Sequence, residues 1–207
     1  MADIVSVQQN TPSDNTLNQD CLLIVGPEMI EIEANSLFLS AASEPFRAMF
    51  RPEWRTSDDI TTQAGLVAIP LPEDDPTALQ LICAVIQHQN HTIPHILPVD
   101  TVLSLAVTAD KYDCSRALRF ASETWLHSDR NAINDLFILA AAAYLLENAT
   151  AFRNITKKMI LLHNGPFAAV SCRDVEAVMD WRMLGKCAAS YCRPFIVHCL
   201  IACVQVC

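Results

Sequence analysis

The segment from residue 20 to residue 50 constrains the fold most, because it places two strand patterns directly before two helix patterns. An apolar run over residues 21–25 ends at Gly26-Pro27, a dipeptide that typically marks a turn. Isoleucines and glutamates then alternate over residues 30–33, which is typical of a half-buried strand. The segment therefore predicts an antiparallel hairpin with a tight turn. A hairpin alone is marginally stable in water, so we expect the following helices to cover it.

Two short helices are predicted immediately after the hairpin. Asn35 can cap the first helix, and Ser43 with Pro45 can start the second, because these residue types favour the first positions of helices. Apolar residues follow each start: Leu37, Phe38 and Ala41 after Asn35, and Phe46, Met49 and Phe50 after Ser43. The order strand, strand, helix, helix within so short a segment is unusual.

This order resembles the beginning of the BTB/POZ domain, a protein-interaction fold. The family has an acid before its first strand, an apolar residue in its second strand, and a leucine, a serine and a phenylalanine on its first two helices; the matching residues here are Asp20, Ile32, Leu39, Ser43 and Phe46. Where the family usually has a histidine and a basic residue, this chain has Asn35 and Ser36. The resemblance therefore implies that Asp20 lacks its usual basic partner, which disfavours a charged corepressor pocket.

The middle of the chain predicts a third strand and three further helices. The strand covers residues 66–71, and Asp75-Pro76 is a capping side chain followed by a proline at the first helical position. Leu79, Ile82, Cys83 and Ile86 then recur at helical spacing, so we predict that Leu79, Ile82 and Ile86 are buried. Another helix is predicted from Asp100, and a further one over residues 114–125.

Two stretches narrow the resemblance. LPEDDPTALQLICAVIQHQN and LAVTADKYDCSRALRFASETWL are similar to the BTB/POZ domains typical of filamentous fungi. The resemblance implies an α+β fold over residues 20–127, in which a small sheet of short strands is capped by a cluster of helices. Residues 1–19 are expected to form a mobile arm, and residues 128–207 a helical extension that packs directly on the domain.

Charge and cysteine content limit the partners and the compartment. The net charge is −9 with only 14 Lys and Arg residues, which disfavours electrostatic binding of nucleic acid. The apolar run over residues 195–207 is shorter than the ~20 residues that span a bilayer, and no secretory signal is recognisable, so we expect no membrane partner. Nine scattered cysteines are then expected to be reduced, buried thiols in a cytoplasmic or nuclear protein.

The sequence offers little to support a metal centre or an active site. His88, His91 and His95 lie in one loop, but neither cysteine nor carboxylate accompanies them at ligand spacing. A second histidine and cysteine group near the end of the chain fits buried thiols better; it comprises Cys187, Cys192, His198, Cys199, Cys203 and Cys207. The four glycines lie far apart, so no phosphate-binding loop is formed. We expect no metal, no cofactor and no enzymatic activity.

The sequence is consistent with three functions of an interaction protein. The resemblance implies a homodimer face on the first helix, formed by Leu37, Phe38 and Ala41, although these residues could equally belong to the core. A second hypothesis is a substrate adaptor of a cullin-RING ubiquitin ligase, with a partner-binding region that comprises Thr101, Val102, Lys111 and Tyr112. Cullin-binding relatives carry an apolar residue and an acid where this chain has Thr101 and Leu103. A third is a transcriptional scaffold whose DNA-binding region comes from a partner.

Overall fold

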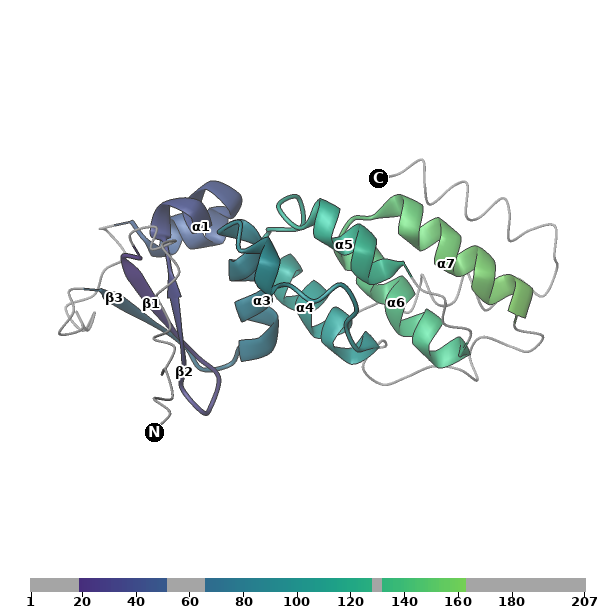
Figure 1. The fold of residues 1–207 in the computed structure, drawn as a ribbon, viewed down its shortest axis with the longest axis horizontal. Helices are drawn as coiled ribbons and strands as arrows, with labels where there is room; N and C mark the ends of the chain where they lie inside the picture. Colours follow the sequence, from purple (N-terminus) through teal and green to yellow (C-terminus); the bar gives the residue numbers. More distant parts are fainter. Residues whose placement is uncertain (1–18, 52–65, 128–131, 163–207) are drawn as a thin grey trace, which may run out of the picture.

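The computed structural model of the chain describes residues 19–51, 66–127 and 132–162 (Figure 1). Its strands form one sheet and are β1 (Cys21–Val25), β2 (Ile30–Ala34) and β3 (Val67–Leu71). β1 is the central strand, antiparallel to β2 and parallel to β3. A parallel pair needs a crossover connection, and the segment that contains the first two helices provides it.

The predicted hairpin of β1 and β2 is confirmed, with Cys21 paired with Ala34 and Val25 with Ile30. Its turn requires Gly26, which has φ +72 and whose amide donates to the Leu71 carbonyl at 2.9 Å. A Cβ atom at this position would lie 2.9 Å from Cγ of Pro76, so a larger residue would displace the helix that begins at Pro76. The hairpin, β3 and the helix after it are therefore tied together at one point.

Both predicted caps of the first two helices are confirmed. Asn35 caps α1 (Ser36–Ala42) and accepts from the amides of Leu37 and Phe38 at 3.1 and 3.2 Å. Ser43 caps α2 (Glu44–Met49) and accepts from the Phe46 amide at 3.1 Å. These bonds satisfy amides that the helices cannot pair internally. The two short helices thus begin where the sequence indicates.

The helix α3 (Pro76–Ile86) packs against β2 on one side and against α4 (Val99–Lys111) on the other, and the short 3₁₀ turn η2 (Asn90–Thr92) connects the two helices. Asp75 caps α3 as predicted, and accepts from the Thr77 amide at 2.8 Å. Leu79 and Ile82 are completely buried and Ile86 nearly so, which confirms the predicted core face. The α4 helix begins after Pro98 without a side-chain cap, and Asp100 lies in its first turn.

The helix predicted over residues 114–125 is shorter in the structure. The helix α5 (Arg119–Leu126) is preceded by turns, because Asp113 has a left-handed backbone with φ +46 and ends α4. The Cys114 amide then donates back to the Ala109 carbonyl at 3.0 Å, which closes the end of α4. An indole N–H from α5 secures the loop before α4, since Trp125 Nε1 donates to the Pro94 carbonyl at 3.0 Å.

The last described helices are α6 (Ile133–Leu145) and α7 (Ala149–Leu162). All eight side chains from residue 136 to residue 143 are buried, since α6 packs on α4 on one side and on α7 on the other. Four consecutive alanines, residues 140–143, let these neighbours approach closely. By residue type, Asp129 or Asn131 could cap α6, but both lie outside the described residues, as does the C-terminal cysteine group.

The α+β architecture is thus as expected, with helices beyond the region that resembles the domain. The sheet lies at one end of an elongated molecule and α7 at the other (Figure 1). The core runs continuously from the sheet through α3, α4 and α6 to α7. The described cysteines, Cys21, Cys83 and Cys114, are free and buried.

Candidate functional site

The amino end of α1 is fixed by three polar side chains from different parts of the chain. The Asp20 carboxylate accepts from the amide and the hydroxyl of Ser36, at 2.7 and 2.5 Å. The backbone N–H of Asn35 donates to Oε1 of Gln87, 52 residues further on, at 3.0 Å. Asp20 therefore has a hydrogen-bond partner, but this partner is Ser36 at the start of α1 rather than a basic residue. An acid facing helix amides is also favoured by the helix dipole.

The outward face of α1 carries exposed apolar side chains. Leu37 is 74 % exposed, and Ala41, one turn later on the same stripe, is also exposed. Phe38 is half-buried and contacts the His88 ring edge-on, with 6.0 Å between the ring centroids. Leu37 and Ala41 are therefore not core residues, whereas Phe38 packs partly against the core. An apolar side chain held in water has area to bury against a partner.

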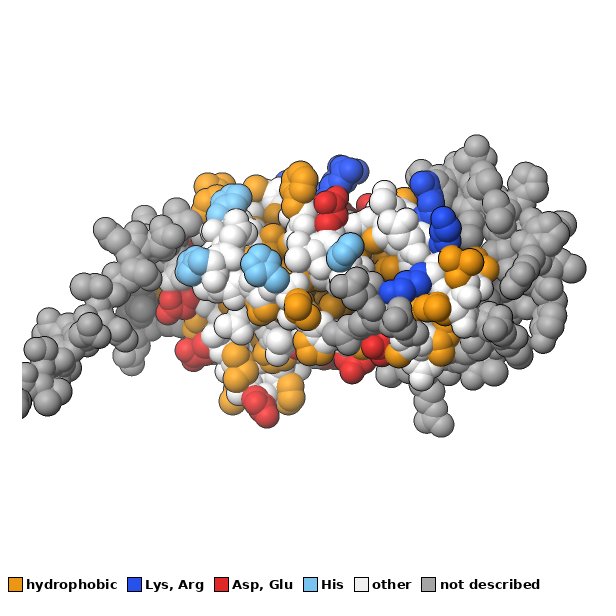
Figure 2. Space-filling view, turned by 45° about the vertical axis from the view of Figure 1, so that its right-hand side comes forward, with side chains coloured by type: hydrophobic (Ala, Val, Ile, Leu, Met, Phe, Trp, Pro, Cys, Tyr) orange, Lys and Arg blue, Asp and Glu red, His pale blue; other side chains and the backbone are white. Residues whose placement is uncertain are grey.

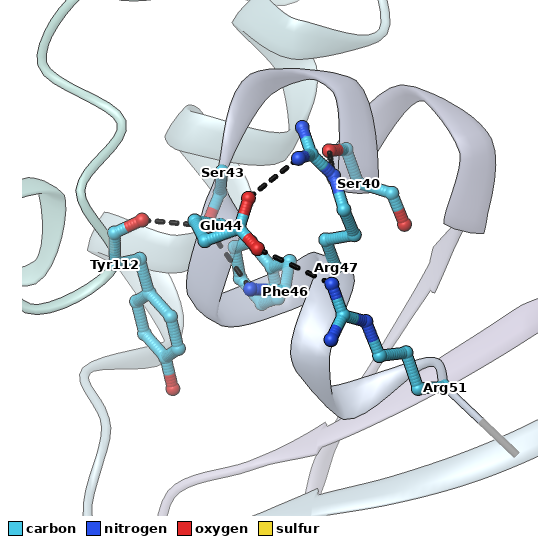
Figure 3. A network of polar contacts seen from close by, with 7 residues as sticks. All are labelled: Ser40, Ser43, Glu44, Phe46, Arg47, Arg51 and Tyr112. Atoms are coloured by element: carbon cyan, nitrogen blue, oxygen red, sulfur yellow. Dashed lines mark hydrogen bonds and ion pairs between the residues drawn. The ribbon is translucent and has the colours of Figure 1, made fainter. Parts of the chain in front are cut away.

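A charged network borders this apolar face where α1 meets α2 (Figure 3). Arg47 is central to it: one guanidinium nitrogen lies 2.5 Å from Oε2 of Glu44, and Nε donates to the Ser40 carbonyl at 3.0 Å. Arg51 approaches the other oxygen of Glu44 at 3.6 Å. All three charged side chains are about half exposed, so these pairs add little stability. They instead hold charged groups in place beside the apolar residues, as at the polar rim of an interface.

The predicted cullin-binding region, which comprises Thr101, Val102, Lys111 and Tyr112, is only partly exposed to solvent. Val102 and Tyr112 are buried, with 0 % and 1 % of their surface exposed, and Thr101 is half-buried. Periodicity places Val102 on the core face of α4, where it faces its own domain. In this structure the side chains of Val102 and Tyr112 therefore have almost no exposed area with which to contact a partner. Lys111 is exposed, but its ammonium lies 2.8 Å from Oδ1 of Asp74.

Tyr112 is the centre of an internal polar network. Its hydroxyl donates to Oδ2 of Asp74 at 2.8 Å, and its backbone carbonyl accepts from the Ser43 hydroxyl at 2.5 Å. Burial raises the pKa of the Tyr112 phenol, and the hydrogen bond and the negative charge of Asp74 raise it further. The network joins the start of α2, the turn before α3 and the end of α4. This role was not visible in the sequence, because Asp74 and Tyr112 are 38 positions apart.

The three histidines that the sequence analysis considered as metal ligands lie in and around the loop before α4. His88, His91 and His95 are exposed, and some histidine side chains are visible on the face shown in Figure 2. Within residues 19–51, 66–127 and 132–162, no three His, Cys, Asp or Glu side chains are placed to hold a metal ion. None of the helices in this part of the chain has both the length and the apolar character needed to cross a bilayer.

A groove lies where α7 meets α5. Two adjoining cavities of about 410 and 480 Å³ form it, and Glu123, Asn148 and Thr150 line both. The first has an apolar floor of Leu126, Leu136 and Ile155, while Arg116 and Arg119 lie along the second. This groove could not be predicted from the sequence, because it forms only where side chains of α5, α6 and α7 come together in the folded chain.

Comparison with known protein families gives one match. A sequence model of the BTB/POZ domain matches residues 10–128, which is more than half of the 207-residue chain. The match includes the sheet, α1 to α5 and the network around Tyr112. No curated protein matches the chain.

Proposed function

The chain belongs to the BTB/POZ domain family, whose members are protein-interaction modules, and on this premise we propose that it self-associates through α1 as a non-catalytic homodimer. The proposed interface has Leu37 and Ala41 at its centre, Phe38 at its inner edge, and Glu44, Arg47 and Arg51 at its rim. It works as a binding surface and needs no cofactor.

The exposure of Leu37 is the observation that supports this proposal most. A leucine with 74 % of its surface in water contributes little to the stability of the monomer. Burial of a leucine side chain in an interface would stabilise the dimer by roughly 1.5–3 kcal/mol. The anchored start of α1 adds to this, because a preorganised surface loses little conformational entropy on association.

The proposal is tested by charge substitution on α1. In Leu37→Asp, an unpaired carboxylate would be buried between the subunits, which should weaken the dimer by orders of magnitude while the monomer stays folded. Phe120→Asp is the matched control, since Phe120 is 82 % exposed on α5, away from α1. In 0.5 M NaCl, where contacts between charged side chains are screened, we expect a helical monomer for Leu37→Asp and an unchanged dimer for Phe120→Asp. Two variants of equal mass in light scattering behind size exclusion would exclude this face.

Phe38→Asp separates the contributions of core and interface. Because Phe38 is half-buried, this variant should lose monomer stability as well as dimer affinity. Thermal unfolding by circular dichroism would show the first effect and light scattering the second.

The groove between α5 and α7 supports a second candidate, the adaptor of a cullin-RING ubiquitin ligase. Clefts between helices accept extended or helical segments of partners. Filling the groove with Thr150→Trp, at an exposed residue that lines both cavities, should abolish co-elution with purified cullin. Thr124→Trp, exposed on α5 and outside the groove lining, is the control. A wild-type chain that elutes separately from cullin would refute this candidate.

A further inference from the structure

The outer edge of the sheet is acidic, and no described residue forms an ion pair with it. Glu28 lies in the hairpin turn, and Glu31 and Glu33 are exposed on β2, which is an edge strand. There is no Lys or Arg between residues 19 and 46, and no ion pair involves these glutamates in the described part of the chain. Glu31 and Glu33 point to the same side of the strand, about 6.6 Å apart along it, so they repel each other. We call these three glutamates the acidic edge.

The opposite charge is found on α7. Arg153 and Lys157 are exposed one turn apart, and no Asp or Glu occurs between residues 148 and 162. Neither side chain forms an ion pair with any described residue. The two residues are separated by about 6 Å along the helix axis, close to the spacing of Glu31 and Glu33. We call Arg153 and Lys157 the basic face of α7.

Each charged surface also has an exposed apolar residue beside it. Met29, 70 % exposed, lies in the turn next to the acidic edge. Leu161, 72 % exposed, follows Lys157 by one further turn of α7. The two surfaces thus carry opposite charges at similar spacing, and each has an exposed apolar side chain beside its charges.

The two surfaces cannot meet within one chain, because β2 and α7 lie at opposite ends of the molecule (Figure 1). On the face shown in Figure 2, the left-hand part has acidic side chains and no basic ones, and Lys and Arg gather further to the right. We propose that the acidic edge of one copy binds the basic face of α7 on a second copy. This contact is head-to-tail, so it can be repeated from copy to copy, unlike a two-fold contact.

The net charge of −9 does not prevent this contact at physiological ionic strength. There the screening length is about 8 Å, so charges far from the contact are screened while apposed side chains still attract. The contact uses neither Leu37 nor Ala41, so it goes beyond the proposed homodimer. It can therefore be tested in the Leu37→Asp background as well as in the wild-type chain.

Sedimentation velocity over a range of protein concentrations, at 0.1 and 0.5 M NaCl, provides the test. At about 0.1 M, where the screening length is near 10 Å, the Leu37→Asp chain should sediment faster as its concentration rises. At the higher salt this increase should disappear. A sedimentation coefficient that depends on concentration at neither salt would overturn the proposal, whether or not the wild-type chain dimerises through α1.

Charge reversal identifies the surfaces. Glu31→Lys with Glu33→Lys should abolish the association although it reduces the net charge, and Arg153→Glu with Lys157→Glu should abolish it too. The chain that carries all four changes should associate again, because the charges are exchanged. Glu73→Lys with Asp100→Lys, at exposed acids outside both surfaces, changes the net charge equally and should have no effect. If the fourfold variant stays monomeric while folded by circular dichroism, the pairing is wrong.

Discussion

The ring of Phe46 lies flat on the ring of Tyr112, with 4.4 Å between their centroids and 2° between their planes. Phe46 belongs to α2 and Tyr112 follows α4, so this contact joins segments 66 positions apart in the chain. The Ser43 hydroxyl, which caps α2, donates to the Tyr112 carbonyl in the same place. The serine and phenylalanine of the family pattern therefore position α2 on the helical core.

Tyr112→Phe tests the polar half of this contact. The ring can keep its place on Phe46, but the buried Asp74 carboxylate loses its 2.8 Å hydrogen bond and retains Lys111. We expect the free energy of unfolding to fall by roughly 1.5–3 kcal/mol, as for hydrogen bonds to charged groups. Tyr144→Phe is the control, because Tyr144 is 43 % exposed and should change stability little. Equal urea midpoints for wild type and Tyr112→Phe would show that the bond is not stabilising.

Ile82→Ala tests the core between the sheet and the helices. Ile82 is fully buried in α3, so truncation removes apolar contacts and leaves a cavity. We expect a loss of roughly 2–5 kcal/mol in the free energy of unfolding. Ile96→Ala, at an isoleucine that is 82 % exposed, should cost far less. Chemical denaturation of both variants measures the difference, and similar losses would contradict the assigned core.

Glu147→Gly should make the protein more stable. Glu147 ends α6 with a left-handed backbone, φ +54, and the Asn148 amide donates to the Ala143 carbonyl at 2.9 Å. Glycine adopts this conformation without the strain of a Cβ atom, so we expect a gain of roughly 0.5–1 kcal/mol after the entropy of the unfolded chain is included. Glu147→Ala keeps the Cβ atom and should give no gain in thermal unfolding. Destabilisation by glycine would show that the Glu147 side chain has a stabilising contact.

Cys83 should make the protein sensitive to alkaline pH. Burial raises the pKa of its thiol to about 12, and nearby Cys21 and Cys114 add to the shift. In the unfolded chain a thiol loses its proton near pH ~8.5. Between these values the unfolded state binds fewer protons, so stability falls by about 1.4 kcal/mol per pH unit for each such thiol. The stability is fully present below the lower value and is lost as the pH rises.

Cys83→Ala is the variant that checks this effect. Its free energy of unfolding, measured in urea from pH 8 to pH 11, should decrease less steeply than that of the wild-type chain. Cys21 and Cys114 also have raised pKa values of about 12, so part of the decrease should remain. Parallel pH profiles would mean that Cys83 does not titrate differently on unfolding.

Local features of the fold could be predicted from the sequence because neighbouring residues determine them. Asn35, Ser43 and Asp75 cap their helices through amides only two or three positions away. The buried face of α3 followed from its periodicity. The hairpin turn followed from Gly26-Pro27.

Features that depend on distant residues could not be predicted. Asp20 binds Ser36 and Asp74 binds Tyr112 only after the chain has folded. Tyr112, which was predicted to lie in a cullin-binding region, is buried because Phe46 and other distant residues cover it. The sequence around Tyr112 does not show that it is covered. The shortened start of α5 depends on the left-handed Asp113, a conformation that an aspartate adopts without a clear sequence signal.

The molar mass of the wild-type chain in solution tests the central proposal most directly. Light scattering behind size exclusion, in 0.5 M NaCl to remove contacts between charged ends, should give twice the 22.9 kDa mass of one chain. The Leu37→Asp variant should give the mass of a single chain under the same conditions. A wild-type chain that remains at 22.9 kDa at high micromolar concentration would contradict self-association through α1.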